Sequence, residues 1–387
     1  MQVENEASVA LGATEVSNSR KKQAHRHPPT PEHATILNDL MPLLSSPLLQ
    51  GAVRLVAPGR PLREGLDRIL RAKTGALVVV GDGPDVLAIC SGGFLLDAEY
   101  SPQRLSELAK MDGAIILSSD SSRIARANVH LLPDPRTPTV ETGTRHRTAE
   151  RVARSVDVPV VAASEEMSVI TVYRADQRHQ IEPISDVLDR SSQALATLER
   201  YRNRLDAVLS TLTNHELDGH VTKRELAVAL QRVEMVRRLG EETRGFTIEL
   251  GDDGRLVELQ LGELLAGVDR EREFLAKDYR LPGIDRLAGL STENLLDLDE
   301  VIDVIWHGER TPAGSRGVLV PKGYRVLARI PRLNDTVIAE VAEHFGGLPK
   351  LVEASVAGLT QVDGVGEVRA RKIRDGLARI LEASSLG

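Results

Sequence analysis

The spacing of apolar residues changes once along this chain, near residue 184. Before that point, short apolar runs such as ALVVV (76–80) alternate with amphipathic stretches such as LREGLDRILRAK (62–73). A short continuous apolar run is typical of a buried strand, and apolar residues every three or four positions are typical of a helix. After residue 184 the pattern is helical, and five leucines fall on one heptad seam that Arg202 interrupts: Leu195, Leu198, Leu205, Leu209 and Leu212. The change predicts two architectures in one chain.

The first architecture is an α/β domain with a mixed sheet wrapped by helices. Its predicted strands are separated partly by hairpin turns and partly by helices, which is typical of mixed sheets. Gly81-Asp82-Gly83 predicts a hairpin turn between strands 76–80 and 86–90. The further predictions are a helix over 102–110, a strand from Ala114, a strand ending at Ser164 and a strand over 168–173.

At 387 residues the chain is long enough for two or three domains, each with its own core. Residues 1–35 are polar and rich in Ser, Pro and His, so we expect a disordered tail. The other predicted boundaries are 36–180 for the sheet domain, 181–315 for a helical spine and 316–387 for a compact helical domain with a local basic excess.

Composition excludes several classes of protein. One cysteine, Cys90, rules out an intramolecular disulfide and any multi-cysteine metal site, which fits a reducing cytoplasm. Neither a membrane-spanning run nor a signal peptide is visible, so we expect a cytoplasmic protein without membrane contact. The aromatic content of 3% argues against stacking as the main way of holding a ligand. The net charge of −7 argues against a protein coated with nucleic acid, but it leaves room for one basic domain.

The stretch GTRHRTAER (143–151) places cations where a helix is predicted to begin. Gly143 is a flexible lead-in, and Thr144 is the predicted N-cap. Arg145, His146 and Arg147 then occupy the first turn, where each positive charge costs a few tenths to about 1 kcal/mol unless an anion binds there. Solvated surface charge is the plain alternative. Three basic residues in one first turn, where acids are preferred, favour a polyphosphate site.

Two further stretches carry chemistry that fits a nucleotide. MDGA (111–114) offers Asp112, which suits a divalent metal and the activation of a hydroxyl, although Asp-Gly alone is more typical of a turn. ANVHLLPDP (127–135) and Ser164-Glu165-Glu166, at a predicted strand end, lie in the same domain. Neither the Walker pattern nor the dinucleotide Gly-x-Gly-x-x-Gly pattern occurs, so a different nucleotide chemistry is expected.

The C-terminal stretch LTQVDGVGEVRARKIRDGL (359–377) predicts a phosphate-binding turn between two helices. Its glycines would expose backbone N–H groups at a helix N-terminus, and the basic helix behind would neutralise neighbouring phosphates. A plain αα-hairpin is the alternative. The segment resembles the helix-hairpin-helix domain of DNA repair proteins, and residues 330–346 look like the first hairpin of a tandem pair, with Asn334 and Asp335 in place of the glycines. The candidate DNA-binding residues are Gly364, Val365, Gly366, Arg369, Arg371, Lys372 and Arg374.

The combination of GALVVVGDG, GGF, LAKMDGAIILSSD, ANVHLLPDP and GTRHRTAER is similar to the diadenylate cyclase domain. With a helical spine and a terminal helix-hairpin-helix, residues from about 50 to the end resemble the DNA integrity scanning diadenylate cyclases. The resemblance implies condensation of two ATP into cyclic di-AMP and two pyrophosphates, with Mg²⁺ or Mn²⁺. It also implies a homo-octamer with active sites paired face to face, and inhibition by branched double-stranded DNA.

The resemblance assigns roles to residues of the sheet domain. Asp112 would coordinate the metal and assist the attacking 3′-hydroxyl, and Gly113 would let the backbone approach the nucleotide. Glu165 and Glu166 stand where relatives can be basic, and no role is assigned to them. The other implied contacts are the triphosphate with Thr144, Arg145, His146, Arg147 and Thr148, the adenine edge with the backbone of Leu131, and phosphate with Ser164.

Two other classes of protein are alternatives for a chain with these residues. A DNA-binding scaffold with a nucleotide-sensing domain would need a broken site, whereas Asp112, Arg145 and His146 are all present. A repair nuclease would need several carboxylates clustered around metal ions, and the first domain shows no such signature in the sequence. The sequence therefore favours an oligomeric, DNA-modulated diadenylate cyclase.

Overall fold

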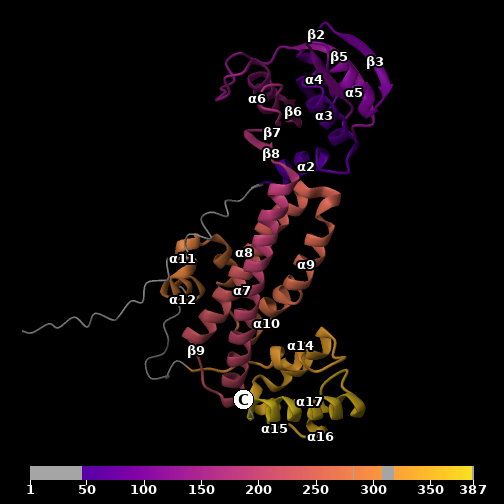
Figure 1. Ribbon diagram of the computed structural model, residues 1–387. Coiled ribbons are helices and arrows are strands. Elements are labelled where there is room, and N and C mark those ends of the chain that lie inside the picture. The colour runs from indigo at the N-terminus through magenta and orange to yellow at the C-terminus, as the bar shows by residue number, and fades with distance from the viewer. Residues whose placement is uncertain (1–45, 282, 307–317, 386–387) are drawn as a thin grey trace, which may run out of the picture.

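A computed structural model describes residues 46–281, 283–306 and 318–385. The predicted tail over 1–35, the start of the sheet domain at 36 and the boundary at 315–316 lie outside those residues. The described chain forms an elongated molecule in which three parts follow one another in sequence order (Figure 1). The sheet domain lies at one end, long helices form the middle, and a group of shorter helices forms the other end.

A mixed sheet of eight strands, counted over the described residues, organises the first part. Strand β1 (Ala76–Val80) runs parallel to β4 (Ala114–Leu117) and antiparallel to β6 (Val160–Ala163). The predicted mixed sheet is therefore confirmed. The other strands pair antiparallel and are β2 (Cys90–Ser91), β3 (Phe94–Glu99), β5 (Arg123–Leu131), β7 (Ile170–Arg174) and β8 (Gln177–Ile181).

Helices cover both faces of this sheet because successive residues of a strand point to opposite sides. Val78 and Val80 of β1 belong to one buried cluster, and Leu77 and Val79 belong to another. The first cluster is closed by α2 (Pro47–Leu55), α3 (Pro61–Arg71) and α5 (Pro102–Leu108), and the second by α4 (Pro84–Ala88) and α6 (Thr144–Val156).

The predicted hairpin at 81–83 is wrong. Gly83 is the N-cap of α4, and Pro84 occupies its first turn, where a fixed φ and a missing N–H suit a helix start. Strand β2 begins only at Cys90, and it pairs with the end of β5 rather than with β1. The apolar residues at 86–89 therefore form a helix turn, in which Val86 is buried, and its C-cap. A short apolar run does not by itself distinguish such a turn from a strand.

The predicted helical spine is confirmed by two long helices that lie side by side, α7 (Ile184–Asp218) and α8 (Lys223–Leu250) (Figure 1). All five seam leucines of α7 are buried. Arg202 interrupts the seam because its guanidinium caps another helix: Nη1 donates to the carbonyl oxygens of Leu264 and Ala266, at 2.9 and 2.8 Å. These carbonyls end α9 (Arg255–Leu265).

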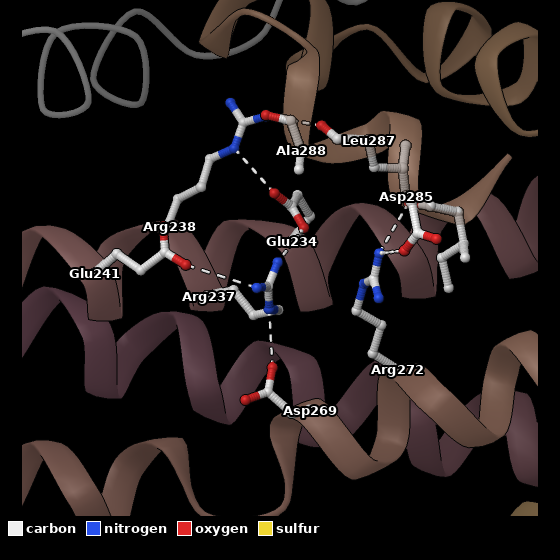
Figure 2. Close-up of polar contacts among 10 residues, drawn as sticks. Glu234, Arg237, Arg238, Glu241, Asp269, Arg272, Asp285, Leu287 and Ala288 are labelled. Atoms are coloured by element: carbon white, nitrogen blue, oxygen red, sulfur yellow. Dashed lines mark hydrogen bonds and ion pairs between the residues drawn. The ribbon is translucent and has the colours of Figure 1, made fainter. Parts of the chain in front are cut away.

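Ion pairs and hydrogen bonds fasten two further spine elements to α8, as Figure 2 shows. The buried carboxylate of Glu234 accepts from Arg237 at 3.0 Å and from Arg238 at 3.2 Å. Arg237 also reaches Asp269 of α10 (Val268–Tyr279), with Nε and Oδ1 2.9 Å apart. Arg238 donates to the carbonyl of Leu287 at 2.8 Å, in the short helix η2 (Ile284–Gly289). One carboxylate thus holds two arginines that reach different elements.

The C-terminal part is helical and has its own core. Its glycine turn lies between α16 and α17, with the basic residues of the motif on α17, and residues 329–334 form a corresponding turn between α13 and α14. No helix among the described residues is long and apolar enough to span a membrane. The helices are α13 (Tyr324–Ala328), α14 (Asp335–Phe345), α15 (Leu348–Glu353), α16 (Val356–Leu359) and α17 (Glu367–Ser385).

A buried polar network joins this part to the spine. Asp278 of α10 accepts backbone N–H groups from Gly323 and Tyr324, both at 2.7 Å, and from Arg325 at 3.1 Å. The Arg325 side chain is itself buried and bonds both carboxylate oxygens of Glu216 on α7 at 2.8 Å. The first helix of the C-terminal part is therefore capped and neutralised by spine residues.

Candidate nucleotide site

A pocket of about 630 Å³ opens at one end of the central strands, where β1 and β4 begin and β5 and β6 end. The strand directions explain why distant motifs meet there. In the antiparallel pairs, Ala76 lies opposite Ala163 and Ala114 lies opposite Val129. The pocket is lined by residues 75–77, 111–114, 129–131, 143–146, 148 and 164–166. It brings together nearly all the predicted site residues.

Asp112 and Gly113 form the bend between α5 and β4, and the Asp112 carboxylate is exposed at the pocket. A Cβ on Gly113 would lie 2.4 Å from the carbonyl carbon of Asn128 and 2.5 Å from its Cα. Asn128 itself has a positive φ of 55°, where the β4–β5 register shifts. Gly113 is therefore required by the close approach of β5, a reason different from the one that the resemblance implies.

The start of α6 forms another wall of the pocket. Gly143, rather than the predicted Thr144, is the N-cap, with extended backbone and no side-chain cap. The prediction failed because Thr144 already has the first helical position. The first turn contains no acid, so its N–H groups and the positive end of the helix face the pocket without an anionic side chain of their own.

Arg145 lines the pocket with its guanidinium against Gly75. A Cβ on Gly75 would lie 1.9 Å from Nη1 of Arg145, so only glycine leaves room for this side-chain position. Arg145 makes no hydrogen bond or ion pair with any residue that the structure describes. A half-buried cation without a carboxylate partner beside a helix N-terminus is suited to binding an anion.

His146 also lines the pocket, and its ring is held from behind. Nδ1 lies 2.8 Å from the hydroxyl of Tyr173 on β7, and this hydroxyl donates to Oε1 of Glu141 at 2.9 Å. Arg178 of β8 donates to the same oxygen. Burial holds the pKa of His146 below its ordinary value, although Glu141 acts in the opposite direction. Nε2 is buried and has no partner within the described residues.

The loop before α6 is tied to that helix by Glu150. This buried carboxylate accepts from the hydroxyl of Thr139 at 2.5 Å and from the N–H of Val140 at 3.0 Å. Arg151 and Arg154 of α6 donate to the carbonyls of residues 137 and 138. The second and third turns of α6 thereby fix the position of Glu141, the carboxylate that supports His146.

One predicted residue is not brought into the pocket. Arg147 points back along the loop, where it donates to the carbonyls of Glu141 at 3.4 Å and Thr142 at 3.2 Å. The other predicted contacts lie among the lining residues: Thr144, Thr148, Leu131 and Ser164. Their contacts with a nucleotide stay predictions.

Ser164 directly follows β6 and begins a tight turn, in which its hydroxyl accepts from the N–H of Met167 at 3.3 Å. Glu165 and Glu166 lie in this turn, are exposed, and line the pocket. Three carboxylates, with Asp112, therefore border the same space. No group of three or more His, Cys, Asp or Glu side chains arranged to hold a metal ion is found among the described residues.

The donor set at Asp112 fits one kind of metal site. A single exposed carboxylate is too little for an all-protein cage, but Mg²⁺ is commonly held by one or two carboxylates together with substrate phosphates. The pocket offers this arrangement, because Asp112 borders the same space as the anion-suited start of α6.

The sequence alone did not reveal Gly75, Glu141 or Tyr173. Glu141 and Tyr173 act through contacts between a loop and a strand 32 residues apart, and neither has a distinctive neighbour in sequence. A weak signal existed at Tyr173, since a tyrosine in an apolar strand normally needs a partner for its hydroxyl.

The basic turn at the other end of the molecule has Gly364 at a φ of 72°, a conformation that favours glycine. The N–H of Val365 is used inside the turn, bonding the carbonyl of Val362 at 3.1 Å, and its side chain is buried. One of the N–H groups expected to face a phosphate is thus used within the turn. Arg332 takes the left-handed conformation, with a φ of 65°, in the corresponding turn between α13 and α14.

The four basic residues behind the turn are all exposed on α17. Arg369 donates to the carbonyl of Gly364, Arg371 pairs with Glu367, and Arg374 donates to the carbonyl of Val352 at 2.7 Å. Lys372 has no such contact with the described residues. The surface is basic and exposed, as a phosphate-binding surface must be.

Comparison with known proteins first defines the class. Residues 63–178 match the family model described as DisA bacterial checkpoint controller nucleotide-binding, and residues 181–313 match the DisA bacterial checkpoint controller linker region. All the pocket-lining residues lie inside the first match. The pocket therefore belongs to a nucleotide-binding domain followed by the linker typical of that class.

Full-length relatives then give the family. The DNA integrity scanning protein DisA of Frankia alni is 49% identical over 348 residues, covering 88% of this chain and 97% of that protein. The protein of the same name from Streptomyces coelicolor is 48% identical over 350 residues, covering 88% and 93%. This chain belongs to the DisA family, and the resemblance found in the sequence is confirmed. A crystal structure of DacA from Staphylococcus aureus is similar over 32% of this chain and 85% of that one, at 24% identity and a TM-score of 0.28, and adds nothing to this assignment.

Proposed function

We propose that this protein is a diadenylate cyclase, which condenses two ATP into cyclic di-AMP and two pyrophosphates. The observation that carries the proposal is the pocket itself. It combines an exposed carboxylate, Asp112, with a helix start that lacks a side-chain cap and with the guanidinium of Arg145, which has no ion-pair partner among the described residues. These groups lie inside a domain of the nucleotide-binding family. These groups supply what transfer of a nucleotidyl group requires, namely a polyphosphate grip and a group that prepares a hydroxyl.

The reaction balances as two identical transfers. In each, the 3′-oxygen of one ATP bonds to the α-phosphorus of the other, and the bond from that phosphorus to the β-phosphate oxygen breaks. Pyrophosphate leaves with the bonding electrons, and the hydroxyl proton is released. Asp112 is the group proposed to orient the 3′-hydroxyl, while Arg145, His146 and the α6 N–H groups bind the triphosphate and its leaving part.

Mg²⁺ or Mn²⁺ is the proposed cofactor, with Asp112 as its protein ligand. When bound, such an ion neutralises charge on the phosphates and polarises them toward attack. Arg147 is assigned no contact in this proposal, because its guanidinium is committed to loop carbonyls.

Two identical transfers need two equivalent ATP sites, so a second copy of the chain is proposed to face this pocket. Exposed apolar residues next to the lining support this assembly: Leu132, Val140 and Met167 are 65%, 73% and 64% exposed. Large apolar side chains rimming a polar pocket favour association of surfaces. A homo-octamer built from such face-to-face pairs is the proposed state.

Modulation by branched or damaged DNA through the α16–α17 turn is the remaining part of the proposal. The relatives are named for DNA integrity scanning. Here the exposed cations of α17 and the glycine turn before it support contact with phosphates rather than with bases.

The test is synthesis of cyclic di-AMP from ATP by the purified chain with Mg²⁺ or Mn²⁺, followed by mass spectrometry. Replacing the carboxylate in Asp112→Asn should lower turnover by about 100-fold or more, the usual scale of a positioned acid–base group. The variant should keep its assembly, because the Asp112 side chain is exposed and makes no hydrogen bond or ion pair with the part of the chain that the structure describes.

Glu165→Gln is the matched control, since it removes another carboxylate that borders the pocket. A similar loss in both variants would mean that pocket charge, and not Asp112, matters. A well-folded oligomer that makes no cyclic di-AMP would refute the cyclase proposal and favour a nucleotide-sensing scaffold.

A further inference from the structure

The hydrogen-bond chain behind His146 determines which nitrogen of its ring carries the proton. Tyr173 has one hydroxyl hydrogen, and it is donated to the carboxylate of Glu141. A carboxylate has no hydrogen to return, and hydrogen bonds from Arg178 and Tyr173 hold the pKa of Glu141 below its usual range, against the effect of burial. The Tyr173 oxygen is therefore the acceptor in its contact with His146, and Nδ1 of the ring is the donor.

A neutral imidazole with its hydrogen on Nδ1 has a bare lone pair on Nε2. This Nε2 is buried, and no described residue gives it a hydrogen bond. Buried polar atoms are rarely left unsatisfied, so an unpaired nitrogen on a pocket-lining residue indicates a group that is missing until a ligand arrives.

The surroundings of the ring indicate what that ligand group is. Arg145 and the uncapped start of α6 border the same pocket and favour an anion. An ionised phosphate oxygen, however, has no hydrogen to offer the Nε2 lone pair. Contact between the two requires a proton on Nε2, which makes the ring an imidazolium.

We propose that His146 takes up a proton at Nε2 when a triphosphate enters the pocket, and that Tyr173 and Glu141 are positioning residues that hold the ring for this uptake. The inference rests on the proposed nucleotide site and adds that His146 supplies one more positive charge there when the nucleotide binds. The carboxylate of Glu141, linked through the Tyr173 hydroxyl, stabilises the imidazolium that forms. The nucleotide is thus bound by the imidazolium of His146, which exists only while the nucleotide is bound.

The charged groups around the ring favour a neutral imidazole in the free protein. Arg145 on its own helix and Arg178 on β8 both oppose a positive charge on His146, and burial acts in the same direction more strongly. Glu141, from the loop before α6, is the opposing group, and Glu150 adds negative charge near Tyr173. A phosphate brought next to the ring adds to the effect of Glu141, which changes the balance toward the protonated form.

Because protonation of His146 is linked to binding, the affinity for the triphosphate depends on pH. The ring gains a proton on binding, so its pKa is higher in the complex than in the free protein. Affinity for the triphosphate is then greatest at low pH and is lost as the pH rises through the pKa of the complex. With one proton taken up, affinity falls by at most about tenfold per pH unit.

The experiment is titration calorimetry of the full-length chain with α,β-methylene-ATP and Mg²⁺, at a pH where the triphosphate is fully ionised. Repeating the titration in buffers of different ionisation enthalpy counts the protons exchanged. Wild type should take up a substantial fraction of one proton per nucleotide. His146→Gln, which cannot titrate, should take up none and should bind with no pH dependence in this range.

Two variants test the positioning residues. Tyr173→Phe removes the acceptor of the Nδ1 hydrogen, and Glu141→Gln keeps an acceptor oxygen while removing the charge. Each should bind the analogue roughly tenfold more weakly than wild type and move the pH dependence to lower pH. Tyr100→Phe is the matched control, since its hydroxyl bonds the carbonyl of Pro61 in the same domain, away from the pocket.

The outcomes separate this inference from the proposed reaction. Binding by wild type without proton uptake, or equal uptake in His146→Gln, overturns the inference even if cyclic di-AMP is made. Normal uptake without any cyclic di-AMP leaves the inference standing and removes the cyclase assignment. A pH dependence that is the same in Glu141→Gln as in wild type would reduce Glu141 and Tyr173 to packing residues.

Discussion

The positions of single pocket residues depend on neighbours from other segments of the chain. Arg145 can lie where it does only because residue 75 has no side chain, and the His146 ring is oriented by a tyrosine and a glutamate from other segments. Gly113 admits the backbone of β5. The arrangement of the charged groups is therefore set as much by small and distant residues as by the charges themselves.

Gly75→Ala tests whether the position of Arg145 depends on the absence of a side chain at residue 75. The added methyl group would take the place of the Arg145 guanidinium, so nucleotide affinity should fall by about tenfold, the scale of a lost charge-assisted hydrogen bond. Thermal stability should barely change, because the displaced group is the mobile end of a side chain. Equilibrium binding and a melting curve, measured side by side, check the two statements.

Gly51→Ala is the matched control, because nothing lies within 4 Å of a Cβ at that position in α2. It should leave nucleotide affinity unchanged and slightly raise stability. Equal affinity in Gly75→Ala and wild type would show that the observed position of Arg145 is not the one that binds phosphate.

The sequence identified Arg145 and His146 because their charges conflict with a helix start. Asp112 stands in a turn, where Asp-Gly is ordinary, and only its combination with the other motifs points to a site. Glu141 and Tyr173 conflict with nothing nearby, and their part in the site arises only when β7 is placed beside the loop. Local patterns reveal local conflicts, whereas partners brought together by folding leave little trace.

Elements with a clear apolar period were predicted well, and polar ones were missed. The α7 seam and strand β1 are buried as expected. Strands β5 (RIARANVHL) and β8 (QRHQI) were overlooked because they carry arginine, histidine and glutamine, and β5 contains a bulge that breaks its alternation. Pairing within the sheet, rather than propensity, makes these segments strands.

The helix after the glycine turn, α17, carries an exposed lysine whose part in DNA binding can be measured. Lys372 is exposed and has no partner in the described chain, so its charge is available to a phosphate. Lys372→Ala should weaken binding to branched DNA regardless of sequence. It should also make the slope of log affinity against log salt less steep by about 0.9, one released counterion.

Arg379→Ala provides the comparison, because Arg379 is an exposed arginine farther along the same helix. It should leave the salt dependence close to that of wild type. Equal effects of the two substitutions would indicate attraction to the general charge of α17, without a site at the turn.

Across the whole molecule, the junction between the spine and the C-terminal part is charged and buried. Arg325 pairs with Glu216 at 2.8 Å and with Glu271 at 3.0 Å, and Tyr279 donates to the same Glu216 at 2.7 Å. A buried arginine with two carboxylates holds one geometry, since any shift leaves charges without partners. The two parts are thus fixed in relative orientation, which gives a physical route between the proposed DNA-binding surface and the spine.

Arg325→Met should destabilise this junction by about 3–5 kcal/mol, the usual result of removing one partner of a buried ion pair. Hydrogen exchange resolved by mass spectrometry should show faster exchange in α13 and in the last turns of α7, with the sheet domain unaffected. Arg280→Met, at an exposed arginine 4.0 Å from Glu343, should change little. Uniform protection in both variants would mean that apolar packing alone holds the junction.

The same junction limits what can be learned by cutting the chain. A protein ending before Gly323 would keep Glu216 and Asp278, but it would lose the guanidinium and the N–H groups that satisfy them. Two carboxylates that are buried in the whole protein would be exposed to water at the end of the spine. The shortened protein would therefore differ from the parent by more than the loss of the proposed DNA-binding surface. Substitutions on α17 are therefore the cleaner way to ask what DNA does to the distant pocket, and a truncated chain is a new protein with its own stability.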